Sequence, residues 1–167
     1  MTTPETFTSP TTEPGLRRLD PRVVRLWRVT LFSETVGLVI AVRVLGRFVD
    51  QWVSAGLLLA VVAVLGLTLT VLWPPARYRA WGFRVREDDL FVRRGVLSRT
   101  TSVIPHARIQ HVDTRSDLLE RWFGLARVIV YTAGIRGAEL IIPGLAAEEA
   151  EALRDRLAAL GGVGDAV

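Results

Sequence analysis

The sequence predicts an α+β membrane protein, in which a two-helix transmembrane hairpin precedes a small β-barrel capped by a C-terminal helix. Three observations predict this fold class. Trp52–Trp73 is a run of 22 residues without a charge. From Ala80 onward, apolar residues alternate with polar ones, which is the period of a β-strand. Ala146–Leu160 then repeats apolar residues at steps of three and four, which is the period of an amphipathic helix.

Composition narrows the class of protein. The 167-residue chain is 50% hydrophobic and has a net charge of +4, two histidines and no cysteine. Disulfides and thiolate metal sites are therefore excluded, and we expect no cofactor or metal. The arginines are scattered without interleaved exposed aromatic residues, so nucleic acid is not an expected partner. A basic chain with long apolar segments instead favours an anionic membrane surface.

Residues 1–25 are predicted to form a disordered N-terminal tail. The beginning of this segment is rich in threonine, proline and serine, a composition that buries too little apolar surface to fold. No basic stretch is followed at once by an apolar core, so the segment is not expected to be a cleavable signal peptide.

Residues 26–75 are predicted to form the transmembrane hairpin, with helices at about 26–48 and 52–73. The second helix is long enough, at about 1.5 Å per residue, to cross a hydrocarbon core of about 30 Å. A tryptophan stands at each of its ends, where aromatic rings prefer the bilayer interface. Pro74 and Pro75 are expected to end it.

The first helix carries one carboxylate, Glu34, inside an otherwise apolar run. By helical rise this residue lies roughly 4–5 Å from the middle of the span, where facing lipid is unfavourable. We expect it to turn toward the second helix, where Gly66 permits close approach and Thr68 or Thr70 can donate a hydrogen bond, or toward an oligomer partner. The alternative to this structural pairing is a functional carboxylate.

Arginine distribution predicts the orientation. Five arginines precede the first helix and four closely follow the second, whereas only Arg43 and Arg47 lie near the connecting turn. The positive-inside rule therefore places both termini and the β-rich domain in the cytoplasm, with the chain crossing the cell membrane twice.

Six strands are predicted between Ala80 and the last helix. They are expected at Trp81–Val85, Leu90–Arg94, Val96–Ile104, Ile109–Arg115, Leu125–Thr132 and Ala138–Ile142. Between the fourth and fifth strands, Asp117 at an N-cap and Glu120 three residues later predict a short helical turn that Gly124 ends. We expect Trp122 and Phe123 on this turn to plug the barrel core. The alternative is an exposed protein-binding patch.

Short strings in this region carry a family resemblance. They include Arg108–Val112, Leu119–Arg121, Phe123–Ala126, Thr132–Gly134 and Ile142–Leu145. In order and spacing they resemble the bacterial pleckstrin-homology-like (PH-like) domain of YdbS-like membrane proteins, which here spans residues 80–162. The positions that match the family motif are Pro105, Arg108, Ile109, Gln110, Glu120, Phe123, Gly124, Gly134, Pro143 and Gly144.

The resemblance implies a membrane-anchored scaffold of bacteria rather than an enzyme. Its partners would be the bilayer and, at the cytoplasmic face, another membrane protein with PH-like domains or a second copy of the chain. The role would be envelope maintenance or tolerance of membrane-active compounds. The alternative function is a subunit of an oligomeric transport or export assembly that uses Glu34.

No catalytic residue is predicted. His111 and Asp113 share a strand face and are expected to form a surface pair. The turn Glu87–Asp89 is acidic, whereas in eukaryotic PH domains the corresponding loop is basic, so tight phosphoinositide binding is not expected. The candidate contacts to anionic lipid are Arg77, Arg79, Arg93, Arg94 and Arg99.

Overall fold

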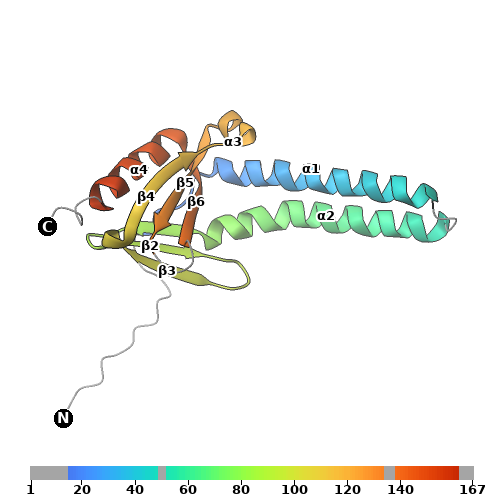
Figure 1. The fold of residues 1–167 in the computed structure, drawn as a ribbon. Helices are drawn as coiled ribbons and strands as arrows, with labels where there is room; N and C mark the ends of the chain where they lie inside the picture. The colour runs from blue at the N-terminus through green and yellow to red at the C-terminus, as the bar shows by residue number, and fades with distance from the viewer. Residues whose placement is uncertain (1–14, 49–51, 134–137, 162–167) are drawn as a thin grey trace, which may run out of the picture.

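In the computed structural model, which describes residues 15–48, 52–133 and 138–161, two long antiparallel helices project from a β-rich domain (Figure 1). The first, α1, spans Arg22–Leu45 and continues into a short 3-10 turn, η1, at Gly46–Phe48. The second, α2, spans Trp52–Ala80 and lies alongside α1. Residues 1–14 of the predicted disordered tail lie outside the described part of the chain.

The helix α2 continues through the two prolines that were predicted to end it. Pro74 and Pro75 lie inside α2, which ends only at Ala80. Each proline removes a backbone hydrogen bond, a loss that normally stops a helix. Tertiary packing opposes this loss here, because Pro74 is less than 2% exposed and Tyr78 in the last turn packs against the domain core. The helix thus enters the domain instead of stopping at the end of its apolar stretch.

The root of α1 is also part of the domain. The helix begins at Arg22, and residues 15–25, predicted as tail, are packed in place. Arg17 and Phe83 exchange two backbone hydrogen bonds of 2.8 and 3.0 Å. Leu19 and Val23 are 2% and 1% exposed and join the hydrophobic core. Apolar residues spaced through an arginine-rich stretch therefore fix the start of α1 to the domain.

Two antiparallel three-stranded sheets replace the predicted closed barrel. The first has the order β1-β2-β3 and the second β4-β5-β6. Their bounds are β1 Gly82–Val85, β2 Asp89–Arg94, β3 Thr100–Pro105, β4 Ile109–Arg115, β5 Leu125–Thr132 and β6 Ala138–Ala146. Within the described residues no strand of one sheet pairs with a strand of the other. Pro105 cannot donate to a ladder and a 3-10 turn, η2 (His106–Arg108), follows it, so the strand run breaks between the sheets.

The last helix, α4 (Ala147–Gly161), packs on β4 and β5. Its buried residues are Ala150, Leu153 and Leu157, which confirms the predicted apolar face. Strand β5 occupies the centre of the second sheet and has no exposed face: Val128, Ile129 and Val130 are at most 3% exposed. The core therefore lies around β5, between α4 and the elements on the opposite face of the sheet.

Candidate functional site

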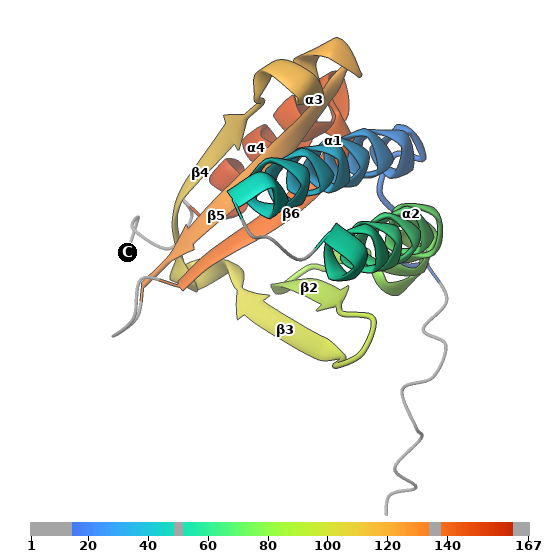
Figure 2. The same ribbon diagram turned by 90° about the vertical axis from the view of Figure 1, so that its right-hand side faces the viewer.

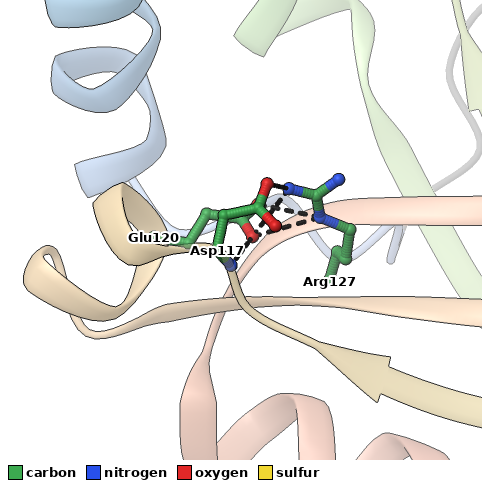
Figure 3. A network of polar contacts seen from close by, with 3 residues as sticks. All are labelled: Asp117, Glu120 and Arg127. Carbon is green, nitrogen blue, oxygen red and sulfur yellow. Dashed lines mark hydrogen bonds and ion pairs between the residues drawn. The ribbon is translucent and has the colours of Figure 1, made fainter.

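A charged network holds α3 (Leu118–Trp122) against β5 (Figure 3). The predicted capping box is present: the Asp117 backbone N–H donates to Glu120 Oε2 over 3.0 Å. Arg127 on β5 donates from Nη2 to Glu120 Oε2 over 2.9 Å and also pairs with Asp117. The hydrogen bond to Glu120 is the largest cause that raises the pKa of Arg127 above its usual value. Among the described residues, Glu120 thus binds the Asp117 N–H and the Arg127 guanidinium, which ties α3 to β5.

The family-motif glycines occupy backbone positions that other residues rarely adopt. Gly124 ends α3 with a φ of +66°, and Gly144 has a φ of +65°. A Cβ added at Gly144 would lie 2.3 Å from Val23 Cγ2, so the root of α1 approaches β6 there without room for a side chain. The Asp20 N–H also donates to the Gly144 carbonyl over 2.8 Å. Gly134 lies outside the described residues.

The remaining motif positions serve strand ends and packing. Pro105 ends β3, and the Arg108 carbonyl accepts a 2.9 Å hydrogen bond from the Ala133 N–H. Gln110 is exposed at a shift in register between β4 and β5. The others, Ile109, Phe123 and Pro143, are buried or half-buried. Most of the described motif positions therefore have a place in the packing or the backbone turns of the domain.

The two histidines have different surroundings. His106 is 6% exposed, and its Nε2 lies 3.1 Å from the Arg86 carbonyl oxygen. His111 Nε2 lies 2.8 Å from Asp113 Oδ1, which confirms the predicted surface pair. In the part of the chain that the structure describes, no three His, Cys, Asp or Glu residues group as metal ligands would.

Glu34 is exposed on α1, and the hydroxyls of the threonines expected opposite it bond within their own helix instead. The Thr68 and Thr70 hydroxyls donate to carbonyls of their own helix, those of Val64 and Gly66, over 2.7 and 2.8 Å. The expected close approach at Gly66 is present, but its neighbour is Thr35, whose Oγ1 would lie 2.7 Å from a Cβ added there. The helix pair therefore places Thr35 at its seam and leaves Glu34 outside it.

The five arginines proposed as lipid contacts divide into two sets. Arg77 and Arg94 line a groove of about 940 Å³ beside α3, and the Arg77 guanidinium lies 4.3 Å from the centre of the Trp27 ring. Arg79, Arg93 and Arg99 line a separate pocket of about 300 Å³. Neighbouring strand residues point to opposite faces, which explains why Arg93 and Arg94 line different hollows.

The apolar side chains of α3 are exposed, so the expected core plug is wrong for Trp122. Trp122 and Leu118 are 79% and 78% exposed, while Phe123 packs against the core. A helix of one turn has a single inward side, and Glu120 and Phe123 occupy it. Figures 1 and 2 place α3 at the end of the domain from which α1 and α2 leave. The exposed apolar patch therefore lies at this helix-bearing end.

Within the described residues one helical segment, Gly56–Ala80, is long and apolar enough to cross a membrane. The family model of the bacterial PH domain matches residues 35–161. The transmembrane protein YdbS of Bacillus subtilis (strain 168) is 32% identical over 154 residues, which is 89% of this chain and 94% of that protein. No solved structure matches the chain. The chain therefore belongs to the YdbS-like membrane proteins that carry a bacterial PH domain.

Proposed function

We propose that this protein is a non-enzymatic membrane adaptor. Both helices cross the bacterial cell membrane, hold the PH domain at the cytoplasmic face, and bind another membrane protein through the side of α1 that carries Glu34. The partner is a second membrane protein with PH-like domains or a second copy of this chain. The adaptor serves envelope maintenance or tolerance of membrane-active compounds.

The antiparallel arrangement of the helices supports two crossings. Helix α1 runs alongside α2 over its length (Figure 1), so a bilayer that surrounds the apolar part of α2 also surrounds α1. The domain joins the ends of both helices that carry the arginine-rich flanks, Leu16–Arg28 and Arg77–Arg86. The positive-inside rule favours the cytoplasm for this end.

The observation that carries the proposal is the exposed carboxylate of Glu34 on a helix at membrane depth. A lone carboxylate in the hydrocarbon core costs about 2.5–3.5 kcal/mol on insertion scales, so it calls for a polar partner. Ser33, Gly37 and Ala41 follow one another at steps of four beside it, and all three are exposed. No atom lies within 4 Å of a Cβ added at Gly37. Small residues in this spacing let a second helix approach closely.

Photo-crosslinking in intact membranes tests this contact. A benzophenone amino acid at Leu38, which is 54% exposed and next to this surface, is expected to give one major adduct. Mass spectrometry should identify the adduct as a second PH-domain membrane protein or a second copy of the chain. The same amino acid at Leu72, which is 62% exposed on α2, is the matched control and should give little.

Equal adducts from both positions, or none from Leu38, would contradict the adaptor proposal. A homo-oligomer that also conducts ions or solutes after reconstitution would favour the transport alternative, in which Glu34 lines a path. Two spans cannot enclose a path alone, so that alternative requires oligomers.

A further inference from the structure

Three arginines from separate elements meet in the smaller pocket. Arg79 comes from the last turn of α2, Arg93 from β2, and Arg99 from the connection between β2 and β3. The pocket encloses about 300 Å³, and none of the described residues that line it is acidic. Among the ion pairs between described residues, none involves these arginines. Three neighbouring like charges repel one another, and a bound anion removes that repulsion.

The pocket lies at the depth of lipid headgroups. The uncharged stretch of α2 ends at Trp73, and Ala76 and Arg79 follow it along the same helix by roughly 4–9 Å of helical rise. The headgroup layer on each side of a bilayer is about 5–8 Å thick. The Arg79 backbone therefore lies at the outer edge of the headgroup layer when the apolar part of α2 fills the hydrocarbon core, and its long side chain can reach back to the phosphates.

A hydrophobic residue stands beside the pocket in the same connection. Leu97 is 89% exposed, and Val96 just before it and Arg99 two residues after it line the pocket. Figure 1 shows the β2–β3 connection reaching along α2 at the helix-bearing end of the domain, and Figure 2 shows it on the opposite side of the helix pair from α3. A leucine in this place is suited to enter the bilayer interface.

We propose that this pocket binds the headgroup of an anionic phospholipid from the bilayer that the chain crosses, with Leu97 inserted next to it. The three guanidiniums can donate hydrogen bonds to the oxygens of a phosphodiester. Because no carboxylate is among the described lining residues, the amine of a zwitterionic headgroup would have no partner there, which favours an anionic lipid. The volume suits a headgroup alone, so the acyl chains stay in the bilayer. The acidic Glu87–Asp89 turn connects β1 to the start of β2, whereas the pocket lies at the end of β2. This site therefore differs from the phosphoinositide loop of eukaryotic PH domains, which corresponds to the acidic turn.

Lipid retention by the full chain tests the proposal. Native mass spectrometry of the purified protein in mild detergent, titrated with phosphatidylglycerol or phosphatidylcholine, counts the lipids that remain bound. We expect retention of phosphatidylglycerol to fall about fivefold for each arginine replaced by glutamine, and about a hundredfold for the triple variant. The triple variant is Arg79→Gln, Arg93→Gln and Arg99→Gln.

A matched triple variant removes the same charge elsewhere. It carries Arg18→Gln, Arg115→Gln and Arg156→Gln, three exposed positions outside this pocket. We expect it to retain phosphatidylglycerol as the unchanged chain does. An equal loss in both triple variants, or equal retention of phosphatidylcholine, would overturn the site. Binding of inorganic phosphate without selective retention of phosphatidylglycerol would also overturn it, because the occupant would then be soluble.

A spin label provides a readout with all three arginines present. The chain has no native cysteine, so Leu97→Cys can be labelled alone in nanodiscs that contain phosphatidylglycerol. We expect the label to be accessible to oxygen and shielded from a water-soluble nickel relaxant, which places it below the headgroups. The label at Glu151→Cys, exposed on α4, should show the reverse. A water-exposed label at position 97 would contradict the insertion.

Discussion

Gly144→Ala is expected to destabilise the chain by about 2–5 kcal/mol. The left-handed backbone at φ +65° costs an alanine about 1–2 kcal/mol. The added methyl also lies 2.3 Å from Val23 Cγ2, and overpacking of this kind typically costs about 1–3 kcal/mol. Since Val23 belongs to the root of α1, the change loosens the attachment of the helix pair to the domain. Thermal unfolding in detergent, followed by near-ultraviolet circular dichroism, measures the loss.

Gly124→Ala is the matched control because its backbone angle is nearly identical, at φ +66°. The added methyl would lie 3.1 Å from Arg22 Nη1, the mobile end of a long side chain that can move away. We expect only the backbone cost of about 1–2 kcal/mol. Combining Gly144→Ala with Val23→Ala should cost less than the sum of the two single changes. Equal destabilisation at the two glycines would show that close packing at Gly144 contributes nothing.

Glu34→Leu is expected to weaken association with the partner by about threefold to thirtyfold. Interhelical hydrogen bonds in membranes contribute about 0.6–2 kcal/mol, and leucine cannot form one. Glu34→Gln keeps the shape and the hydrogen-bonding capacity, so its association should stay close to that of the unchanged chain. The measurement co-purifies the partner, once photo-crosslinking has identified it, from samples that were not crosslinked. The amount of partner recovered with each variant, divided by the total detergent-extracted protein, gives the change in association.

Leu72→Gln is the control for a polar group on an exposed helix surface, and it should leave association unchanged. Stronger insertion and unchanged association for Glu34→Leu would mean that the carboxylate faces lipid without a partner, against the adaptor proposal. If Glu34→Gln abolishes activity in cells while the protein remains inserted and assembled, the carboxylate is functional and the transport alternative gains.

Local patterns in the sequence were sufficient where neighbouring residues decide the structure. Strands β4 and β5 have the predicted bounds, Ile109–Arg115 and Leu125–Thr132. The sequence also predicts the capping box at Asp117 and Glu120 and the buried face of α4, because each depends on residues within one or two helical turns. These elements make the domain recognisable from its sequence.

Contacts between segments that are distant in the sequence could not be predicted from such local patterns. The continuation of α2 through Pro74 depends on burial that only the assembled domain supplies. The exposure of Trp122 follows from Glu120 and Phe123 taking the inward side of α3. Likewise, the five candidate lipid-contact arginines appear as one scattered set in the sequence. They divide into a groove and a pocket only once β2 has paired with β3 and the end of α2 has packed beside them.

Thiol labelling of intact cells tests the two-span anchor and its orientation most directly. The chain has no cysteine, so single cysteines can be placed at Thr3, at Gln51 between the helices, and at Ala159 on α4. With an impermeant reagent, only Gln51→Cys is expected to be labelled in intact cells, whereas all three should react after permeabilisation. Labelling at Thr3→Cys or Ala159→Cys in intact cells would contradict a domain at the cytoplasmic face.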